Sequence, residues 1–246
     1  GVLPVDHGRD AHAVVQPPTV KANAGAAKKV LIVTGLEYPG HPWRQTAPAL
    51  ADYLAQDKRL EVSLTEDPRT LGLATLNNYD VIVLNYQNHE VPAPDGALAN
   101  LRKAVEGGKG LVLFHFACGA FIDWPTKTVA PEFGAIAGRV WNPKLRGHDP
   151  RGPFRVQISD ASHPITKGLA DFDTEDELYT CLDGSAPIRV LASAKSKADQ
   201  KDYPMAFVVE AGKGRTFHCV LGHDLKALNE AVGTLYRRGT AWAAGL

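Results

Sequence analysis

An uncharged run of residues that ends in a histidine constrains the fold more than any other feature of this chain. The run is Gly110–Phe114, with the sequence GLVLF, and His115 follows it directly. A short strand without charged residues is typical of a parallel sheet that is covered on both faces. Open parallel sheets bind ligands beyond the carboxyl ends of their strands. His115 is therefore either a site residue or a core histidine whose ring is satisfied by its neighbours.

Strands and helices alternate along the first half of the chain. Apolar or alternating stretches predict strands at 29–34, 60–65, 79–85 and 110–114, and later at 154–158, 188–192, 205–209 and 215–221. Helices are predicted from Thr46 as the N-cap, at 95–106 and at 225–237. This order predicts an α/β fold in which helices cover both faces of a parallel sheet.

The domain organisation follows from length and composition. The chain has 246 residues, enough to bury a large core. Residues 1–28, rich in Ala, Pro, Val and Gly, are predicted as an N-terminal arm or linker, and residues 29–246 as one domain. The stretch from Cys118 to Pro153 is expected to be irregular and functional. Because the chain starts at Gly1, we expect a removed export signal and a periplasmic or secreted protein, or otherwise a cytoplasmic one.

Charge and cysteine content exclude several classes of partner. The 27 basic and 27 acidic residues cancel, and no block of Lys or Arg is longer than a pair, so neither nucleic acid nor an anionic membrane surface is expected to bind. No apolar run approaches the roughly 20 residues that a membrane span needs. Cys118, Cys181 and Cys219 lie far apart, so neither a zinc ribbon nor a disulfide framework is indicated.

Histidines follow several of the predicted strands. If their loops share one edge of the sheet, His41, His115, His148 and His223 converge on one cleft. Imidazole is the commonest metal ligand and the side chain that exchanges protons near neutral pH. We therefore expect a divalent metal such as zinc on His115, His148 and His223, completed by a nearby carboxylate. The two candidates are Glu177 and Asp224.

The segment 176–179 adds two further candidates. Glu177 is a candidate base, and the phenol of Tyr179 a candidate donor to a developing oxyanion. Asp176 is expected in a solvated acidic turn. His163 precedes a proline and is assigned to structure, while His218 and Cys219 are assigned to the core.

Aromatic residues surround the candidate cleft. Trp43, Phe121, Trp124 and Trp141 lie in or near the predicted cleft loops, where aromatic faces suit the C–H faces of sugar rings. The alternative is that a loop tryptophan anchors its loop to the core. We expect only some of the four to touch a ligand.

The ordered motifs resemble those of the ThuA-like, or trehalose-utilisation, family. They span residues 29–246 and comprise the first strand with His41 and Trp43, the run 108–112 into His115, Phe121 with Trp124, His163–Thr166, Asp176–Tyr179, Gly212–Arg215 and Leu221–Asp224. The resemblance implies a three-layer flavodoxin-like, mostly parallel sheet, similar to class I glutamine amidotransferases. Pro42 between His41 and Trp43, and the thiol of Cys118, depart from the family pattern.

The resemblance also implies a role in carbohydrate catabolism. Members of the family are linked to glucosides such as trehalose, often beside sugar oxidoreductases that make 3-keto sugars. We therefore expect proton abstraction α to a keto group of a glucoside, followed by elimination, isomerisation or hydrolysis. His115, His41, Glu177, Tyr179 and His223 are the candidate catalytic residues.

Two other functions remain open at this point. A non-catalytic sugar-binding module that serves a sugar dehydrogenase would use the same side chains. Glutamine amidotransferase chemistry is disfavoured, because Cys118 lies three residues beyond His115 and lacks the preceding glycine of a nucleophile turn. No nucleotide cofactor is expected, since no phosphate-binding motif occurs.

Overall fold

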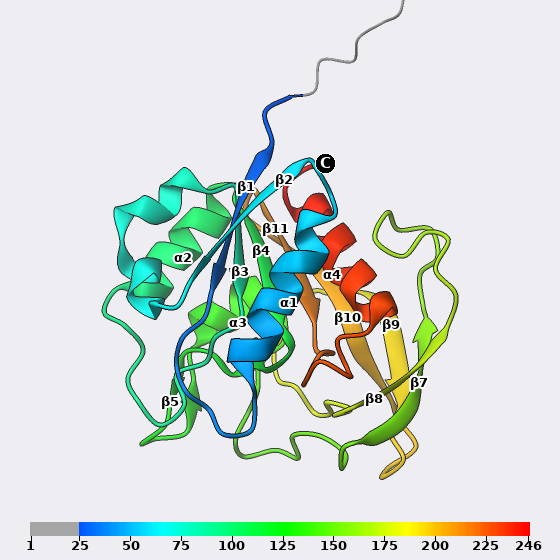
Figure 1. Cartoon of the computed structure of the whole chain (residues 1–246). Helices are drawn as coiled ribbons and strands as arrows, with labels where there is room; N and C mark the ends of the chain where they lie inside the picture. The colour runs from blue at the N-terminus through cyan, green and yellow to red at the C-terminus, as the bar shows by residue number, and fades with distance from the viewer. Residues whose placement is uncertain (1–24) are drawn as a thin grey trace, which may run out of the picture.

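A computed structural model describes residues 25–246 of the protein (Figure 1). Its strands are β1 (Lys28–Val33), β2 (Leu60–Thr65), β3 (Val81–Leu84), β4 (Gly110–Phe114), β5 (Ile122–Asp123), β6 (Thr128–Val129), β7 (Gly152–Ile158), β8 (Phe172–Asp176), β9 (Arg189–Lys195), β10 (Asp202–Ala211) and β11 (Gly214–Cys219). Its α-helices are α1 (Trp43–Ala55), α2 (Ala97–Glu106), α3 (Pro131–Ala137) and α4 (Glu230–Ala243). Three 3₁₀ helices are η1 (Pro68–Gly72), η2 (Ala74–Asn78) and η3 (His115–Gly119).

One nine-stranded sheet of mixed direction organises the described chain, in the order β2-β1-β3-β4-β11-β10-β9-β7-β8. The pairs from β2 to β11 are parallel, as predicted for the first half of the sequence. The pairs from β11 to β8 are antiparallel, so the expectation of a mostly parallel sheet is corrected. The physical reason is connection length, because a parallel pair needs a crossover of a dozen or more residues. Only Gly212 and Lys213 separate β10 from β11, a two-residue hairpin.

Helices cover both faces of the sheet. Helices α1 and α4 bury Leu50, Leu54, Leu235 and Tyr236 in the cluster on one face. Helices α2 and α3 bury residues such as Leu101 in the cluster on the other face. The finer likeness to flavodoxin and to class I glutamine amidotransferases stays a prediction. No helix within residues 25–246 is long and apolar enough to cross a membrane.

Several element boundaries differ from those predicted. Helix α1 begins at Trp43, because backbone amides already bond to Pro42 O one turn before the predicted N-cap, Thr46. Helix α4 begins at Glu230, where the Asn229 side chain accepts from two backbone amides and caps it. The stretch 118–153 is less irregular than expected, since it holds β5, β6 and α3. Most of the predicted arm, residues 1–28, lies outside the described residues, and Lys28 already belongs to β1.

His218 makes the stability of the fold sensitive to acid. This histidine is fully buried in β11, its Nδ1 lies 2.9 Å from Ala137 O, and burial lowers its pKa to about 4. In the unfolded chain the histidine pKa is near 6.5, so below this pH the unfolded chain binds a proton that the folded chain excludes. The free energy of unfolding therefore decreases as the pH falls below 6.5. Between pH 7 and pH 5 we expect His218 to cost about 2 kcal/mol of unfolding free energy.

Urea unfolding of the wild type and of His218→Asn at both pH values measures this contribution. The asparagine amide can still donate to Ala137 O but does not titrate. The variant is therefore expected to lose the about 2 kcal/mol of extra pH dependence. Equal pH dependence in the two proteins would contradict the assignment.

Candidate functional site

His115 lies where the chain turns sharply at the end of β4. Its φ of +44° is in the left-handed region, and the chain continues directly into η3. The ring is fully buried, with Nδ1 2.7 Å from Val220 O. Because a carbonyl can only accept, Nδ1 donates this bond and the neutral ring keeps a lone pair on Nε2. The backbone N–H donates to the Tyr236 hydroxyl at 3.2 Å. Both bonds hold Nε2 in one orientation.

Four side chains converge beyond the carboxyl ends of β1, β4, β8 and β11. They are His41, His115, Glu177 and His223, and one ligand atom from each lies within 4.8 Å of all the others. The four antiparallel pairs between β11 and β8 reverse the strand direction four times, so β8 runs in the same direction as β11. The carboxyl ends of all four strands therefore lie at the same edge of the sheet. The sheet therefore gathers residues that are up to 182 positions apart, His41 and His223.

The spacing of these atoms fits a divalent cation. Glu177 Oε2 is 3.2 Å from His223 Nδ1, 3.5 Å from His115 Nε2 and 3.8 Å from His41 Nε2. His115 Nε2 and His223 Nδ1 are 3.3 Å apart. A tetrahedral ion with ligands at about 2.0–2.1 Å places neighbouring ligand atoms about 3.3 Å apart. Three imidazole nitrogens and a carboxylate oxygen are also a donor set that zinc accepts.

The electrostatics of the cluster favour a bound cation. Burial opposes ionisation of Glu177, but the neighbouring imidazoles of His115 and His223 outweigh it and hold the pKa of this carboxyl well below its usual range. Burial and the neighbouring His115 lower the pKa of His41 to about 2. At neutral pH the site therefore offers a carboxylate at Glu177 and a neutral imidazole at His41, the protonation states that a metal requires. The hydrogen bond with Glu177 raises the pKa of His223, so a metal bound to this imidazole would displace a proton.

His148 takes a different place from the one predicted. Its Nε2 lies 3.7 Å from Glu177 Oε1, the oxygen that does not face the three clustered histidines. Its Nδ1 is 2.7 Å from Asp149 O and so donates there. His41 stands where the sequence led us to expect His148 as the third histidine ligand. The other carboxylate considered, Asp224, instead accepts from Arg151 at 2.7 Å and from Ala227 N.

Tyr179 brings a phenol to the same cluster. Its hydroxyl lies 3.3 Å from His115 Nε2 and 3.5 Å from His41 Nε2. The side chain is buried, and burial together with neighbouring acidic groups raises its pKa well above the ordinary value. Tyr179 is therefore protonated at neutral pH and can donate a hydrogen bond.

Asp176 is a buried neighbour of the cluster that sequence reasoning did not place there. The expected solvated turn is instead the buried end of β8, and Asp176 is 0% exposed. Its carboxylate accepts from Gly222 N at 2.7 Å, from Glu177 N at 2.8 Å and from His223 N at 3.3 Å. Asp176 thus ties two members of the cluster together. The acidic residues around it in the sequence gave no sign of this position, since two of its three partners are 46 and 47 residues away.

A cavity of about 370 Å³ opens onto the cluster. His41, Glu177, Tyr179 and His148 line it, together with Trp124 and Trp141. Tyr38 and His89, which sequence reasoning did not select, also line it; both lie in segments that follow strands of the parallel half. Tyr38 stacks on His41 with ring centroids 4.6 Å apart. The cavity has the size of a small-molecule site.

Two of the four predicted aromatic residues lie away from this cavity. Trp43 is buried in the core under the start of α1, with the Arg44 guanidinium 4.2 Å above its ring. Phe121 packs against Phe133, with ring centroids 5.0 Å apart, on the other face of the sheet. Both anchor their segments, because each ring fills a space in the core.

Cys118 lines the cavity but is poorly suited to act as a nucleophile. Its side chain is buried, and desolvation raises the pKa of the thiol well above its usual value. The reactive form of cysteine is the thiolate. The structure therefore provides no activation of this thiol for amidotransferase chemistry.

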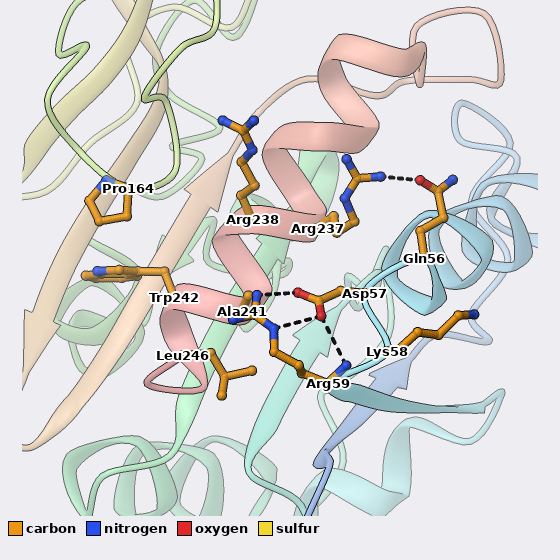
Figure 2. Close-up of a pocket in the computed structure, with 10 residues that line it drawn as sticks. All are labelled: Gln56, Asp57, Lys58, Arg59, Pro164, Arg237, Arg238, Ala241, Trp242 and Leu246. Carbon is orange, nitrogen blue, oxygen red and sulfur yellow. Dashed lines mark hydrogen bonds and ion pairs between the residues drawn. The ribbon is translucent and has the colours of Figure 1, made fainter. Parts of the chain in front are cut away.

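A separate pocket, between the end of α1 and α4, holds none of the predicted site residues (Figure 2). Its charged groups largely bind their neighbours, as Figure 2 shows for Arg59 with Asp57 and for Arg237 with Gln56. It lies at the amino end of β2, away from the edge that carries His115.

Comparisons with known proteins agree with the sequence motifs. The family model described as trehalose utilisation, ThuA, matches residues 29–243. A ThuA-like protein from Parabacteroides merdae ATCC 43184 is 25% identical, with a TM-score of 0.74 over 89% of this chain and 90% of that chain. One from Bacteroides uniformis ATCC 8492 is 20% identical, with a TM-score of 0.68 over 93% and 95%.

The same fold also occurs inside a larger enzyme. A β-galactosidase from Bacillus circulans sp. alkalophilus is 12% identical, with a TM-score of 0.58 over 89% of this chain but 30% of that chain. No curated protein matches this chain. The family match covers most of the sequence and the ThuA-like structures most of the fold, and on this basis the chain belongs to the ThuA family of trehalose-utilisation proteins.

Proposed function

We propose that this protein acts on a 3-keto-glucoside by removing the proton α to the keto group, at a site that holds a divalent metal. One observation carries the proposal, the convergence of His41, His115, Glu177 and His223 beside the Tyr179 hydroxyl. Of these residues, His41, Glu177 and Tyr179 line a small cavity. Family membership supports a sugar as the substrate. A metal bound by these four residues would supply positive charge for the carbonyl oxygen of the sugar.

His148 is suited to be the base. It lines the cavity, it is 35% exposed, and its Nδ1 donates to Asp149 O, so that Nε2 keeps a lone pair. The Glu177 carboxylate lies 3.7 Å from Nε2 and stabilises the imidazolium that forms. We therefore assign His41 as a ligand and His148 as the base, supported by the position of His148 beside the Glu177 oxygen that faces away from the other three histidines.

The reaction then proceeds in two steps. His148 Nε2 takes the proton from C2, and the electrons of the C2–H bond move into the C3 carbonyl, where Tyr179 O–H donates to the developing oxyanion. The electrons return as the C1–O bond breaks, and the leaving oxygen takes the proton from the imidazolium of His148. The products are an unsaturated keto sugar and the free aglycone. The substrate needs a carbonyl, so a sugar oxidoreductase is the class of partner that would supply it.

The chemical test uses exchange with solvent deuterium. Wild-type protein loaded with Zn²⁺ or Mn²⁺ is expected to exchange the C2 proton of a 3-keto-glucoside, as followed by NMR, and to release the aglycone. Binding of the sugar by calorimetry without exchange under any metal condition would contradict the proposal and favour a non-catalytic sugar-binding module.

Metal removal should also lower stability. At a free metal concentration 100 times the dissociation constant, binding adds about 2.7 kcal/mol to the unfolding free energy, which raises Tm by roughly 5–10 °C in a protein of this size. Thermal unfolding with and without chelator, alongside metal analysis of the protein, measures this. His223→Gln should abolish the shift, whereas Glu175→Gln, an exposed neighbour on β8, should retain it. Equal shifts in both variants would place the metal elsewhere.

A further inference from the structure

A second cavity, of about 690 Å³, lies on the other side of Trp124. The segment between β3 and α2, the first turns of α2, and residues 121–125 form its walls. Trp124 lines both this cavity and the one above the histidine cluster. The two cavities therefore meet at one side chain.

The lining of the second cavity is mostly carbon. Val91, Pro92, Pro94, Leu98 and Ile122 are among the side chains that form it. Such a surface gains free energy by covering an apolar ligand.

Several of the polar groups around this cavity bind within the protein or are acidic. Asn88 Nδ2 donates to Val91 O and Ile122 O, at 2.9 and 2.8 Å. The Arg102 guanidinium donates to Glu106 at 2.7 Å. The acidic groups that remain, Glu90 and Glu132, can accept but cannot donate and would repel an anion. A hydroxyl-rich sugar would lose hydrogen bonds to water here, whereas a neutral aromatic ring would not.

The wall between the cavities carries unpartnered polar atoms. Trp124 Nε1 and His89 Nδ1 are buried and have no hydrogen-bond partner among the described residues. Their rings meet edge to face, with centroids 5.2 Å apart. Buried polar groups are normally hydrogen-bonded.

We infer that the second cavity binds an apolar, aromatic aglycone of the substrate, while the sugar ring occupies the cavity above the histidines. The inference rests on the proposed function for the position of the sugar. It defines the substrate class as 3-keto derivatives of aryl glucosides in preference to those of disaccharides.

Kinetics with two substrates test the inference. For wild-type protein loaded with metal, kcat/KM for a 3-keto phenyl glucoside is expected to exceed that for 3-keto-trehalose at least 10-fold. Val91→Asp, which adds a charge at an exposed lining position, and Ala99→Trp, which fills the cavity, should each reduce that ratio at least 10-fold. Leu73→Asp, at an exposed apolar residue outside the cavity, is the matched control and should leave the ratio unchanged.

A binding measurement separates this inference from the proposed function. Calorimetric titration with unoxidised phenyl glucoside requires no turnover, and Val91→Asp is expected to weaken its binding at least 10-fold while Leu73→Asp does not. Such binding without any exchange on keto sugars would retain the aglycone site and overturn the proposed reaction. Turnover with equal kcat/KM for the two substrates, or ratios that neither cavity variant changes, would retain the reaction and overturn the aglycone site.

Discussion

Glu177→Gln is expected to lower kcat/KM for a 3-keto-glucoside by 10²-fold or more, with little loss of folded structure. Glu177 Oε2 faces nitrogen atoms of His41, His115 and His223 at 3.2–3.8 Å, and Oε1 faces His148. The amide has nearly the same shape but no charge, so the proposed metal and the imidazolium proposed at His148 would both lose their counter-charge. Exchange of the C2 proton, measured by NMR, and metal content per chain are the two readouts.

The matched control for this substitution is Glu175→Gln. Glu175 lies two residues earlier, in β8, and binds Arg151 and Lys226 at the surface rather than the histidine cluster. We expect its kcat/KM to stay within a few-fold of the wild type. Activity of Glu177→Gln close to that of this control would show that the cluster is not the reaction centre.

Asp176→Asn is expected to lower the unfolding free energy by about 1–3 kcal/mol, the cost of a buried donor left without its acceptor. The wild-type carboxylate accepts from the backbone amides of Glu177, Gly222 and His223. One oxygen of the asparagine cannot replace both carboxylate oxygens, so at least one amide loses its partner. Urea unfolding at neutral pH measures the loss.

Asp176 also positions the site, and this role has its own readout. If the loop that carries His223 shifts, the metal dissociation constant should rise at least 10-fold even under conditions where the variant is fully folded. Asp173→Asn, on the same strand but with its side chain 78% exposed, is the control for both measurements. An Asp176→Asn protein that is less stable but binds metal with unchanged affinity would leave Asp176 a purely structural role.

The strands were predictable because their signal is local. Runs such as Val81–Leu84 and Gly110–Phe114 are fully buried. A run of four or five residues without a charge is enough to predict such a buried strand. The antiparallel half of the sheet was harder to predict from the sequence. Its strands at 189–195 and 202–211 were located approximately, but their direction depends on connection length and pairing, and β8 was hidden in an acidic stretch.

The candidate site was predictable only in part. His115 was recognisable from its position after an uncharged strand, and His41, Glu177 and His223 from the loops that the family motifs occupy. The choice between His41 and His148 as the third histidine of the cluster depends on side-chain direction across a cavity. The sequence does not show that Trp43 and Phe121 pack in the core whereas Trp124 and Trp141 line the cavity. An aromatic side chain in a loop can do either.

The sequence by itself determined most of the segments that form the main sheet and its helices, and that histidines follow several strands, because hydrophobic periodicity and turn residues act over a few positions. Only the tertiary structure decided that Asp176 is buried, that Tyr179 meets His41 across 138 positions, and that a second cavity shares Trp124 with the first. The physical reason is that burial of a charge and convergence of ligands depend on partners from distant strands, and the mixed sheet brings those partners to one edge.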